Sequence, residues 1–168
     1  PNSLHGGPTG FHTKVWDAVQ PDASTVIFNY TSPDGEEGFP GTLEIEMTYR
    51  LENETNALVI EYRATTDKAT IVNLTNHGAG IANPTPTVVN NIVTINADFY
   101  VPMDEVSIPT GEILKVEDTP MDFRTPHTVG ERIDDKFQQL INGAGYDHCY
   151  VLNKTESGEL NLAATCTE

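Results

Sequence analysis

The chain has 168 residues, of which 38% are hydrophobic, so it is long enough to bury a sizeable core and too apolar to be disordered. Its 25 acidic and 9 basic residues give a formal net charge of −16, and such a negative surface repels the phosphates of nucleic acids and anionic lipids. We therefore expect one domain over residues 1–168 that binds neither nucleic acid nor membranes. No apolar run approaches the roughly 20 residues that span a bilayer, and no signal-peptide pattern is visible.

The first half of the chain has the alternating pattern of antiparallel strands. A short strand is expected at 25–30. In residues 43–51 every second side chain is apolar and those between are polar or charged, which is typical of a strand with one wet face. Residues 57–66 repeat this pattern after a turn at 52–56, so the two segments predict a hairpin.

Residues 70–77 are expected to form the next strand. Asn73, Thr75 and His77 would then share one face, because side chains alternate along a strand. A strand with three polar residues on one face is expected to line a cleft. On periodicity alone, the same pattern also describes a sheet face turned to water that carries an ordinary surface histidine.

The second half predicts further short strands at 92–97, 147–152 and 159–165, separated by turns rich in Pro and Gly. Only residues 129–141 have apolar side chains at helical spacing. Without repeats or a linker, the pattern predicts an all-β fold, an antiparallel β-sandwich with one short helix.

Both cysteines are expected on neighbouring strands joined by a turn at 153–158. If Asn153 pairs with Glu159, Cys149 lies opposite Ala163, and its sulfur is too far from Cys166 to form a disulfide. Two reduced thiols fit a reducing compartment, and we expect a cytoplasmic location.

Two glycine-rich loops, 4–11 and 31–41, are candidates for function because loops of a sandwich are held rigidly by its strands. The first lacks the features of a phosphate-binding loop, so its glycines indicate a tight bend or a close approach of backbone to ligand. The second has the acidic content of a calcium loop without its spacing, and a solvated turn is the default interpretation. The five histidines lack the Cys/His spacing of a zinc site, and no metal is expected.

Six short motifs follow one another along the chain. They are Asn-Ser-Leu-His-Gly-Gly at 2–7 with Gly10, Phe11 and Trp16 after it, Ser-Pro-Asp-Gly-Glu-Glu-Gly-Phe-Pro-Gly at 32–41, Asn-Leu-Thr-Asn-His at 73–77, Ile-Pro-Thr-Gly-Glu-Ile at 108–113, Pro-Met-Asp-Phe-Arg at 120–124 and Gly-Tyr-Asp-His at 145–148. In this order they resemble the motifs of aldose 1-epimerases (galactose mutarotases) over the whole chain. The resemblance implies the large antiparallel supersandwich of that family, with a sugar cleft and no cofactor.

The resemblance implies roles for three residues. His77 matches the general acid that protonates the ring oxygen of a hexose as the ring opens, and His5 matches a second histidine that contacts the sugar and stabilises charge. Asp147 matches a carboxylate that hydrogen-bonds sugar hydroxyls. Imidazole suits its task because it titrates near neutral pH, and a fixed carboxylate can orient a pyranose. No role is implied for His12, His127 or His148.

We expect the side chains of His5, His77 and Asp147 to open into one cleft. The two imidazoles should lie within about 10 Å of each other, roughly the span of a hexose and its hydrogen-bond partners.

The sequence departs from the family pattern after His77. There the family has a Ser-Tyr-Phe-Asn-like stretch whose tyrosine helps to line the sugar site, whereas this chain has Gly-Ala-Gly-Ile at 78–81, with Ala79 in the place of the tyrosine.

A second departure concerns the catalytic base. The family's glutamate base near its C-terminus and its sugar-binding arginine before the His-Gly-Gly loop have no counterpart here, and neither Glu156, Glu159 nor Glu168 lies in a matching motif. We therefore expect a middle segment of a longer mutarotase, incomplete at both ends, that is inactive alone and has the missing N- and C-terminal segments as partners.

The resemblance implies an aldose 1-epimerase that interconverts the α and β anomers of a free aldose such as galactose or glucose. One alternative is a sugar-binding β-sandwich that keeps the cleft but lacks the catalytic base. A hexose-phosphate epimerase is disfavoured because only 9 Lys and Arg residues are spread along the chain. A purely structural sandwich leaves the polar face at 70–77 unexplained.

Overall fold

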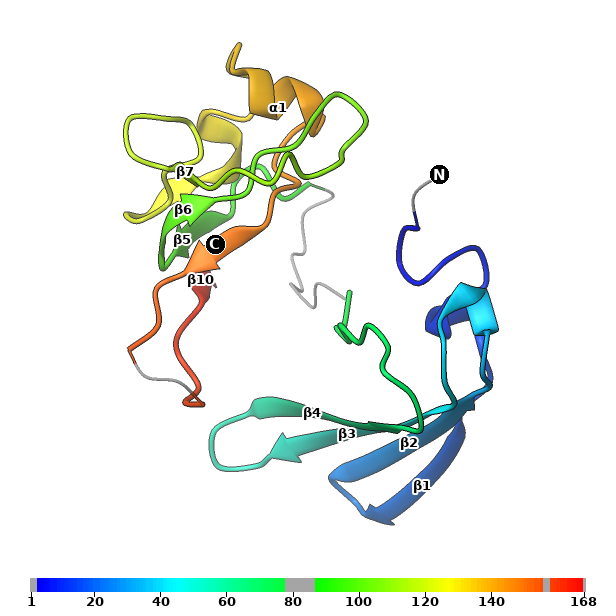
Figure 1. The fold of residues 1–168 in the computed structure, drawn as a ribbon. Helices are drawn as coiled ribbons and strands as arrows, with labels where there is room; N and C mark the ends of the chain where they lie inside the picture. Colours follow the sequence, from blue (N-terminus) through cyan, green and yellow to red (C-terminus); the bar gives the residue numbers. More distant parts are fainter. Residues whose placement is uncertain (1–2, 78–86, 156–157, 168) are drawn as a thin grey trace. The chain divides into compact units, whose positions relative to one another are not determined.

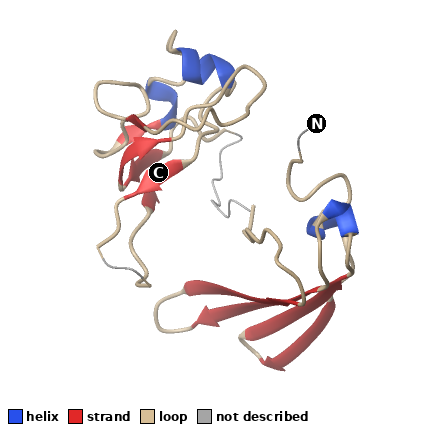
Figure 2. Ribbon diagram, in the orientation of Figure 1, coloured by secondary structure: helices blue, strands red, loops and turns tan. Residues whose placement is uncertain are grey.

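The computed structural model describes residues 3–77, 87–155 and 158–167. The chain divides into two compact units, Pro1–Gly78 and Ala79–Glu168, and each is described by itself. In both units the sheets are antiparallel and the helices are short (Figures 1 and 2). The expected all-β class is confirmed, whereas the single domain over 1–168 stays a prediction.

A four-stranded antiparallel sheet forms the first unit, and strands adjacent in sequence are neighbours in it. The strands are β1 (Asp17–Asp22), β2 (Thr25–Ser32), β3 (Leu43–Glu52) and β4 (Ala57–Thr66). The pairing of β3 with β4 runs from Leu43 opposite Thr66 to Glu52 opposite Ala57 without a shift. The expected hairpin is therefore confirmed.

The alternating pattern gives this sheet two unlike faces. Leu43 and Ile45 are buried on one face, where Phe28 and Tyr49 also meet edge to face with ring centroids 6.0 Å apart. The intervening residues of β3, such as Glu44, point to the opposite, polar face because successive side chains of a strand alternate.

The expected strand at 70–77 is wrong, since none of these residues is in a strand. Instead of a backbone ladder, side-chain contacts are made by Asp67, just before the segment, and by Asn76 within it. The backbone N–H of Thr42 donates to Asp67 Oδ1 at 2.8 Å, and Asn76 Nδ2 donates to the hydroxyl of Tyr49. A period-two polar pattern produces a strand only where a neighbouring edge pairs with it, and β4 pairs only with β3 among the described residues.

The second unit contains two three-stranded antiparallel sheets, in the orders β10-β5-β8 and β7-β6-β9. Their strands are β5 (Ile92–Ile95), β6 (Ala97–Tyr100), β7 (Leu114–Lys115), β8 (His127–Thr128), β9 (Tyr150–Leu152) and β10 (Ala164–Thr167). Asn96 separates β5 from β6. Its N–H donates to the carbonyl of Ala163 and its carbonyl accepts from the N–H of Asn153, each at 2.8 Å, so the chain passes from one sheet to the other at this residue.

This change of sheet explains why the expected hairpin of 147–152 with 159–165 is wrong. β9 pairs with β6, whereas β10 pairs with β5 and places Cys166 opposite Val93. Glu159 does not pair with Asn153 in a ladder, because β9 and β10 pair instead with β6 and β5, the strands on the two sides of Asn96. Cys149 and Cys166 are nevertheless free thiols, as expected.

The expected helix at 129–141 is only partly present. A 3-10 turn, η3 (Val129–Glu131), and a short helix, α1 (Gln138–Asn142), occupy its ends. Between them the N–H of Asp135 bonds to the carbonyl of Arg132, and the N–H of Phe137 bonds to the carbonyl of Asp135 at 2.7 Å. These tight turns replace the helical ladder. Two further 3-10 turns, η1 (Phe11–Thr13) and η2 (Glu36–Gly38), lie in the loops of the first unit.

The core of the second unit is built from large apolar side chains. Its buried members are Tyr100, Val116, Met121 and Leu140, and Phe137, Tyr146 and Tyr150 pack against them. The hydroxyls of these last two tyrosines donate to the carbonyls of Pro120 and Met121, and burial raises the pKa of both phenols. Among the described residues, no helix is long and apolar enough to cross a membrane.

Candidate active site

The first unit brings His5 and His77 together although they belong to separate irregular segments. Their ring centroids lie 4.9 Å apart and their planes are inclined by 74°. Both side chains are exposed. The expected proximity of the two imidazoles is therefore met without the strand that was expected to carry His77.

Tight turns place His5. The N–H of Gly7 donates to the carbonyl of Leu4 at 3.0 Å, and that of Gly10 donates to the carbonyl of Gly7 at 3.2 Å. His5 itself has a φ of 54°, a backbone conformation that is uncommon for a residue other than glycine. A Cβ on Gly10 would lie only 2.3 Å from the His5 carbonyl oxygen. Glycine at this position lets the chain pass directly against the backbone of His5.

Glu37, in the loop between β2 and β3, holds the other side of the His5 loop. Thr9 donates both its N–H, at 3.2 Å, and its hydroxyl to Glu37 Oε1. A Cβ on Gly7 would lie 2.2 Å from Glu37 Oε2. The loop at 31–41 is thus a support for the His5 loop, and the default interpretation as a solvated turn missed the role of Glu37. Both glycine-rich loops were visible in the sequence, but the contact between them was not.

The side chain of the neighbouring Glu36 is half-buried, and its carboxylate contacts three donors. Tyr30 donates its hydroxyl at 2.9 Å, Ser32 its hydroxyl at 2.6 Å, and the Lys14 ammonium lies 2.6 Å from Oε1. Burial acts to raise the pKa of Glu36, but the hydrogen bonds from these donors outweigh it and the pKa is lowered. Glu36 is therefore held as a carboxylate that fixes the loop to β2.

Aromatic rings fix the chain that follows the His5 loop. The ring of Tyr30 lies 5.7 Å from that of Phe11 and 5.4 Å from that of Trp16. Trp16 Nε1 also donates to the Phe11 carbonyl at 3.0 Å. This cluster packs η1 onto β2, so both ends of the His5 loop are anchored.

The segment that carries His77 is anchored at both ends as well. At its start, the Lys68 ammonium pairs with the carboxylate of Asp34, whose Oδ1 accepts the N–H of Gly41 at 2.6 Å. At its end, Asn76 reaches Tyr49 on the apolar face of the sheet. These polar contacts hold His77 beside His5. Gly-Ala-Gly-Ile at 78–81, with Ala79, lies outside the described residues.

Asp147 belongs to the second unit. Its side chain is exposed, and its carboxylate makes no hydrogen bond or ion pair with another described residue. From 146 to 152 the side chains alternate between half-buried and exposed, beginning with the half-buried Tyr146. Asp147 therefore points outward from a segment whose neighbouring side chains point inward, which leaves the carboxylate free to accept hydrogen bonds from a ligand.

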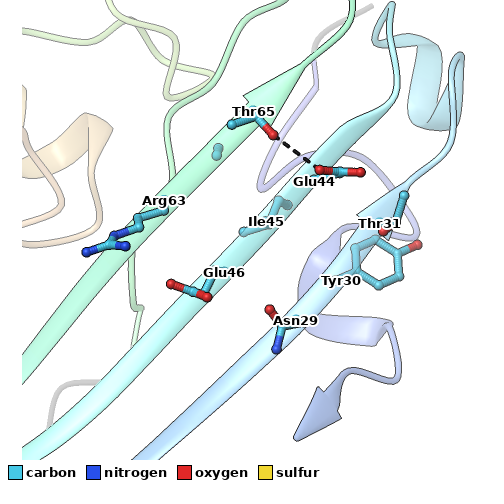
Figure 3. Close-up of a pocket in the computed structure, with 9 residues that line it drawn as sticks. Asn29, Tyr30, Thr31, Glu44, Ile45, Glu46, Arg63 and Thr65 are labelled. Atoms are coloured by element: carbon cyan, nitrogen blue, oxygen red, sulfur yellow. Dashed lines mark hydrogen bonds between the residues drawn. The ribbon is translucent and has the colours of Figure 1, made fainter. Parts of the chain in front are cut away.

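A hollow of about 360 Å³ lies on the polar face of β2, β3 and β4 (Figure 3). In register, Asn29, Glu46 and Arg63 form one row across the strands. In the next row, Thr65 donates to Glu44 at 3.4 Å. This hollow lies on the face opposite to Tyr49 and contains none of the expected site residues. Within residues 3–77, 87–155 and 158–167, no group of three or more His, Cys, Asp and Glu side chains could hold a metal ion.

Comparisons with known proteins identify the family of this chain. The family model described as aldose 1-epimerase matches residues 1–167. The chain is 42% identical to galactose mutarotase from Homo sapiens over 156 residues, which are 90% of this chain and 43% of that protein. It is 38% identical to aldose 1-epimerase from Escherichia coli K12 over 160 residues, 94% of this chain and 45% of that protein. The chain thus spans less than half the length of these curated relatives.

A solved structure supports the same relationship. Galactose 1-epimerase from Lactobacillus acidophilus superposes with a TM-score of 0.83 at 31% identity, over 98% of this chain and 48% of that chain. This likeness confirms the galactose mutarotase-like fold class. Together with the family match over nearly all residues, it shows that the chain belongs to the aldose 1-epimerase family.

Proposed function

We propose that the protein acts as an aldose 1-epimerase, which interconverts the α and β anomers of a free hexose such as galactose or glucose. The observation that carries this proposal is the pair of exposed imidazoles of His5 and His77, 4.9 Å apart. Imidazole can deliver a proton and take it back near neutral pH, and two rings at this distance can both reach one sugar ring.

In the proposed reaction, His77 protonates the ring oxygen while a base removes the proton of the anomeric hydroxyl. The bond between C1 and the ring oxygen breaks, and C1 becomes the carbonyl carbon of the open-chain aldose. Rotation about the C1–C2 bond exposes the other face of this carbonyl. Attack by the same hydroxyl then closes the ring, as its proton returns to His77 and the base returns its own proton to the anomeric oxygen.

The other residues bind rather than transfer protons. His5 contacts the sugar and stabilises the charge that develops on the ring oxygen, and Asp147 accepts hydrogen bonds from hydroxyls to orient the pyranose. No glutamate of the chain lies in a motif that matches the family's base. We assign the base to a residue outside these 168 residues, and we expect the 168-residue chain alone to bind sugar weakly and to show no turnover.

The charges of the first unit support a free sugar over a sugar phosphate. Lys14 and Lys68 each pair with a carboxylate. Arg50 and Arg63 lie on the polar face of the sheet, opposite the face that Asn76 contacts. Each cation in the described part of this unit is therefore either paired with a carboxylate or placed on the other face of the sheet. A bound phosphate group would need a cation beside it.

Polarimetry of freshly dissolved α-galactose tests this function on the complete natural polypeptide that carries the sequence. The wild type should accelerate mutarotation, and His77→Ala should lower kcat by about 10² to 10⁴, the usual contribution of a positioned general acid. His77→Asn should fail equally, because an amide cannot transfer a proton. The control is His12→Asn, a change at another exposed histidine, which should keep full activity.

The result that would contradict the proposal is a wild type that binds galactose without accelerating mutarotation. That outcome would favour the sugar-binding β-sandwich instead, and Ala79→Tyr would then be the first reversion to examine.

A further inference from the structure

His148 follows Asp147 directly, and its imidazole is turned into the second unit. It belongs to the half-buried side of the alternating segment at 146–152, whereas Asp147 belongs to the exposed side. Its ring meets that of Tyr100 edge to face, with centroids 5.9 Å apart and planes inclined by 79°. Tyr100 is itself a buried member of the core. The residue after Asp147 is therefore packed against the core of this unit.

One oriented amide fixes the direction of the His148 ring. Nε2 of His148 lies 3.1 Å from Oε1 of Gln139 in α1. The same Oε1 accepts the N–H of Met103 at 2.8 Å, and Gln139 Nε2 donates to the Met103 carbonyl at 3.1 Å. Because both backbone groups of Met103 orient the amide, an acceptor faces His148. Nε2 must then carry the hydrogen and donate it.

The other ring nitrogen cannot take up a proton at low cost. Nδ1 of His148 is buried and has no hydrogen-bond partner among the described residues. A proton on it would leave a buried donor unpaired. Burial accordingly lowers the pKa of His148, although the charge of Asp147 acts to raise it. The ring is held as the neutral tautomer with a single donor.

The backbone before Asp147 is fitted closely around this ring. A Cβ on Gly143 would lie 3.1 Å from Cε1 of His148 and 2.8 Å from the carbonyl oxygen of Gly145. Gly145 has a φ of 125°, in the region that favours glycine. Tyr146 holds the chain on one side of Asp147 through its contacts with the core and with the Pro120 carbonyl, so loss of His148 would remove the side-chain anchor on the other side.

We propose that His148, held by Gln139, is a positioning residue that fixes the backbone at Asp147 and presents its carboxylate to the sugar. The inference rests on the proposed function, which assigns Asp147 to the sugar hydroxyls. A carboxylate on a fixed backbone loses less conformational freedom on binding than one on a mobile loop. His148 should therefore act on sugar binding more than on proton transfer.

Kinetics of the complete natural polypeptide test this role. His148→Leu fills much of the same space with an apolar side chain and removes the donor to Gln139. It should raise KM for galactose about fivefold to tenfold, the size expected for one buried hydrogen bond, and change kcat less than about twofold. His148→Gln restores an N–H donor and should recover a KM within about twofold of the wild type.

The matched control is His127→Leu. His127 is a half-buried histidine of the same unit whose ring bonds to Glu131 at 3.0 Å and to Thr125 at 3.2 Å. Its replacement should leave KM unchanged, even where it lowers the melting temperature. An equal rise of KM in both variants would show a general loss of structure and overturn the positioning role.

A double mutant tests whether His148 acts through Asp147. In an Asp147→Ala background, His148→Leu should cause no further rise in KM, because the group that it positions is gone. A second, multiplicative rise in KM would overturn the inference. The inference would also be overturned if the single variant His148→Leu were active and had the same KM as the wild type.

Hydrogen exchange separates this inference from the proposed function. The peptide that covers residues 143–149 should exchange faster in His148→Leu than in the wild type, whether or not the protein turns over sugar. If the wild type neither binds galactose nor accelerates mutarotation, the proposed function fails, and unchanged exchange in this peptide would separately overturn the positioning role.

Discussion

The two units hold their candidate site residues by different means. In the first, His5 and His77 lie on irregular segments that are tied down by individual polar contacts, such as Glu37 to Thr9 and Asn76 to Tyr49. In the second, Asp147 projects from a segment whose inward side chains pack on a continuous core.

This difference has a physical consequence. A residue held by close backbone approach and single hydrogen bonds moves when one atom is added or removed, while the bulk of the unit keeps its stability. A residue held by packing responds to lost volume, and the unit loses stability with it. Substitutions at the contacts that hold the His5 loop should therefore change activity, whereas substitutions in the core of the second unit should change stability.

The largest expected effect is on the stability of the second unit. Leu140 of α1 is 3% exposed, so Leu140→Ala should lower the free energy of unfolding by about 2 to 5 kcal/mol. The same substitution at Leu160, which is 102% exposed, should change it by less than about 0.5 kcal/mol. Chemical denaturation of the two variants measures the difference. Equal losses would refute the idea that packing holds this unit.

The next effect is on activity and arises in the first unit. Gly10→Ala places a methyl group where the His5 carbonyl lies and should lower kcat/KM about 10²-fold, because small displacements of catalytic groups are that costly. The control is Gly111→Ala, since a Cβ there meets nothing within 4 Å. It should cost some stability, because its φ is 88°, but no activity. A fully active Gly10→Ala enzyme would contradict the positioning of His5 described above.

A smaller effect is expected from Glu37. Glu37→Ala removes the acceptor for Thr9 and should lower kcat/KM about fivefold to tenfold, with a change in stability below about 1 kcal/mol. Glu37→Gln keeps an acceptor oxygen and should lose about twofold. A mutarotation assay beside a thermal melt distinguishes the two quantities. Parallel losses of both in Glu37→Ala would remove the contrast between the units.

The smallest effect is a difference in acid sensitivity. Because the folded-state pKa of His148 is lowered from 6.5, the unfolded chain binds the proton more readily, and the second unit should begin to lose stability as the pH falls below about 6.5. In the first unit the pKa of Glu36 is lowered from 4.5. Its contribution is present above that value and is lost only as the pH falls below it.

Hydrogen exchange of each unit between pH 7 and 4 would measure these two onsets. His148→Gln should remove the loss of stability in the second unit that begins near pH 6.5, because an amide does not titrate there. A first unit that loses protection at the higher pH would contradict the assignment.

The sequence predicted those parts of the fold in which local pattern and pairing agree. Strand β3 follows from strict alternation over ten residues, and β4 follows from a similar pattern that the apolar Val59 interrupts. The segment at 70–77 shows the same alternation but pairs with no described strand. Lys68, just before the segment, pairs with Asp34, and Asn76 within it bonds to Tyr49. Alternation of apolar and polar residues indicates which side chains share a face. A strand also requires a neighbouring strand with which its backbone can pair.

The local sequence pattern also could not predict which strands pair over long distances in the chain. The change of sheet at Asn96 sends β9 and β10 to different partners, and no feature within 147–165 encodes it. For the site, the motifs singled out His5, His77 and Asp147, and the roles of these residues stay predictions. The support from Glu37 depends on a contact between two loops, and that from Gly10 depends on how one loop folds back on itself; a single sequence reveals neither.

A crystal structure of the complete natural polypeptide with galactose would show which residues hold the sugar. We expect the sugar ring oxygen within about 3 Å of a His77 ring nitrogen, with His5 against the sugar and the Asp147 carboxylate on its hydroxyls. Galactose bound instead in the hollow beside Glu46 and Arg63, with both histidines free, would contradict this expectation.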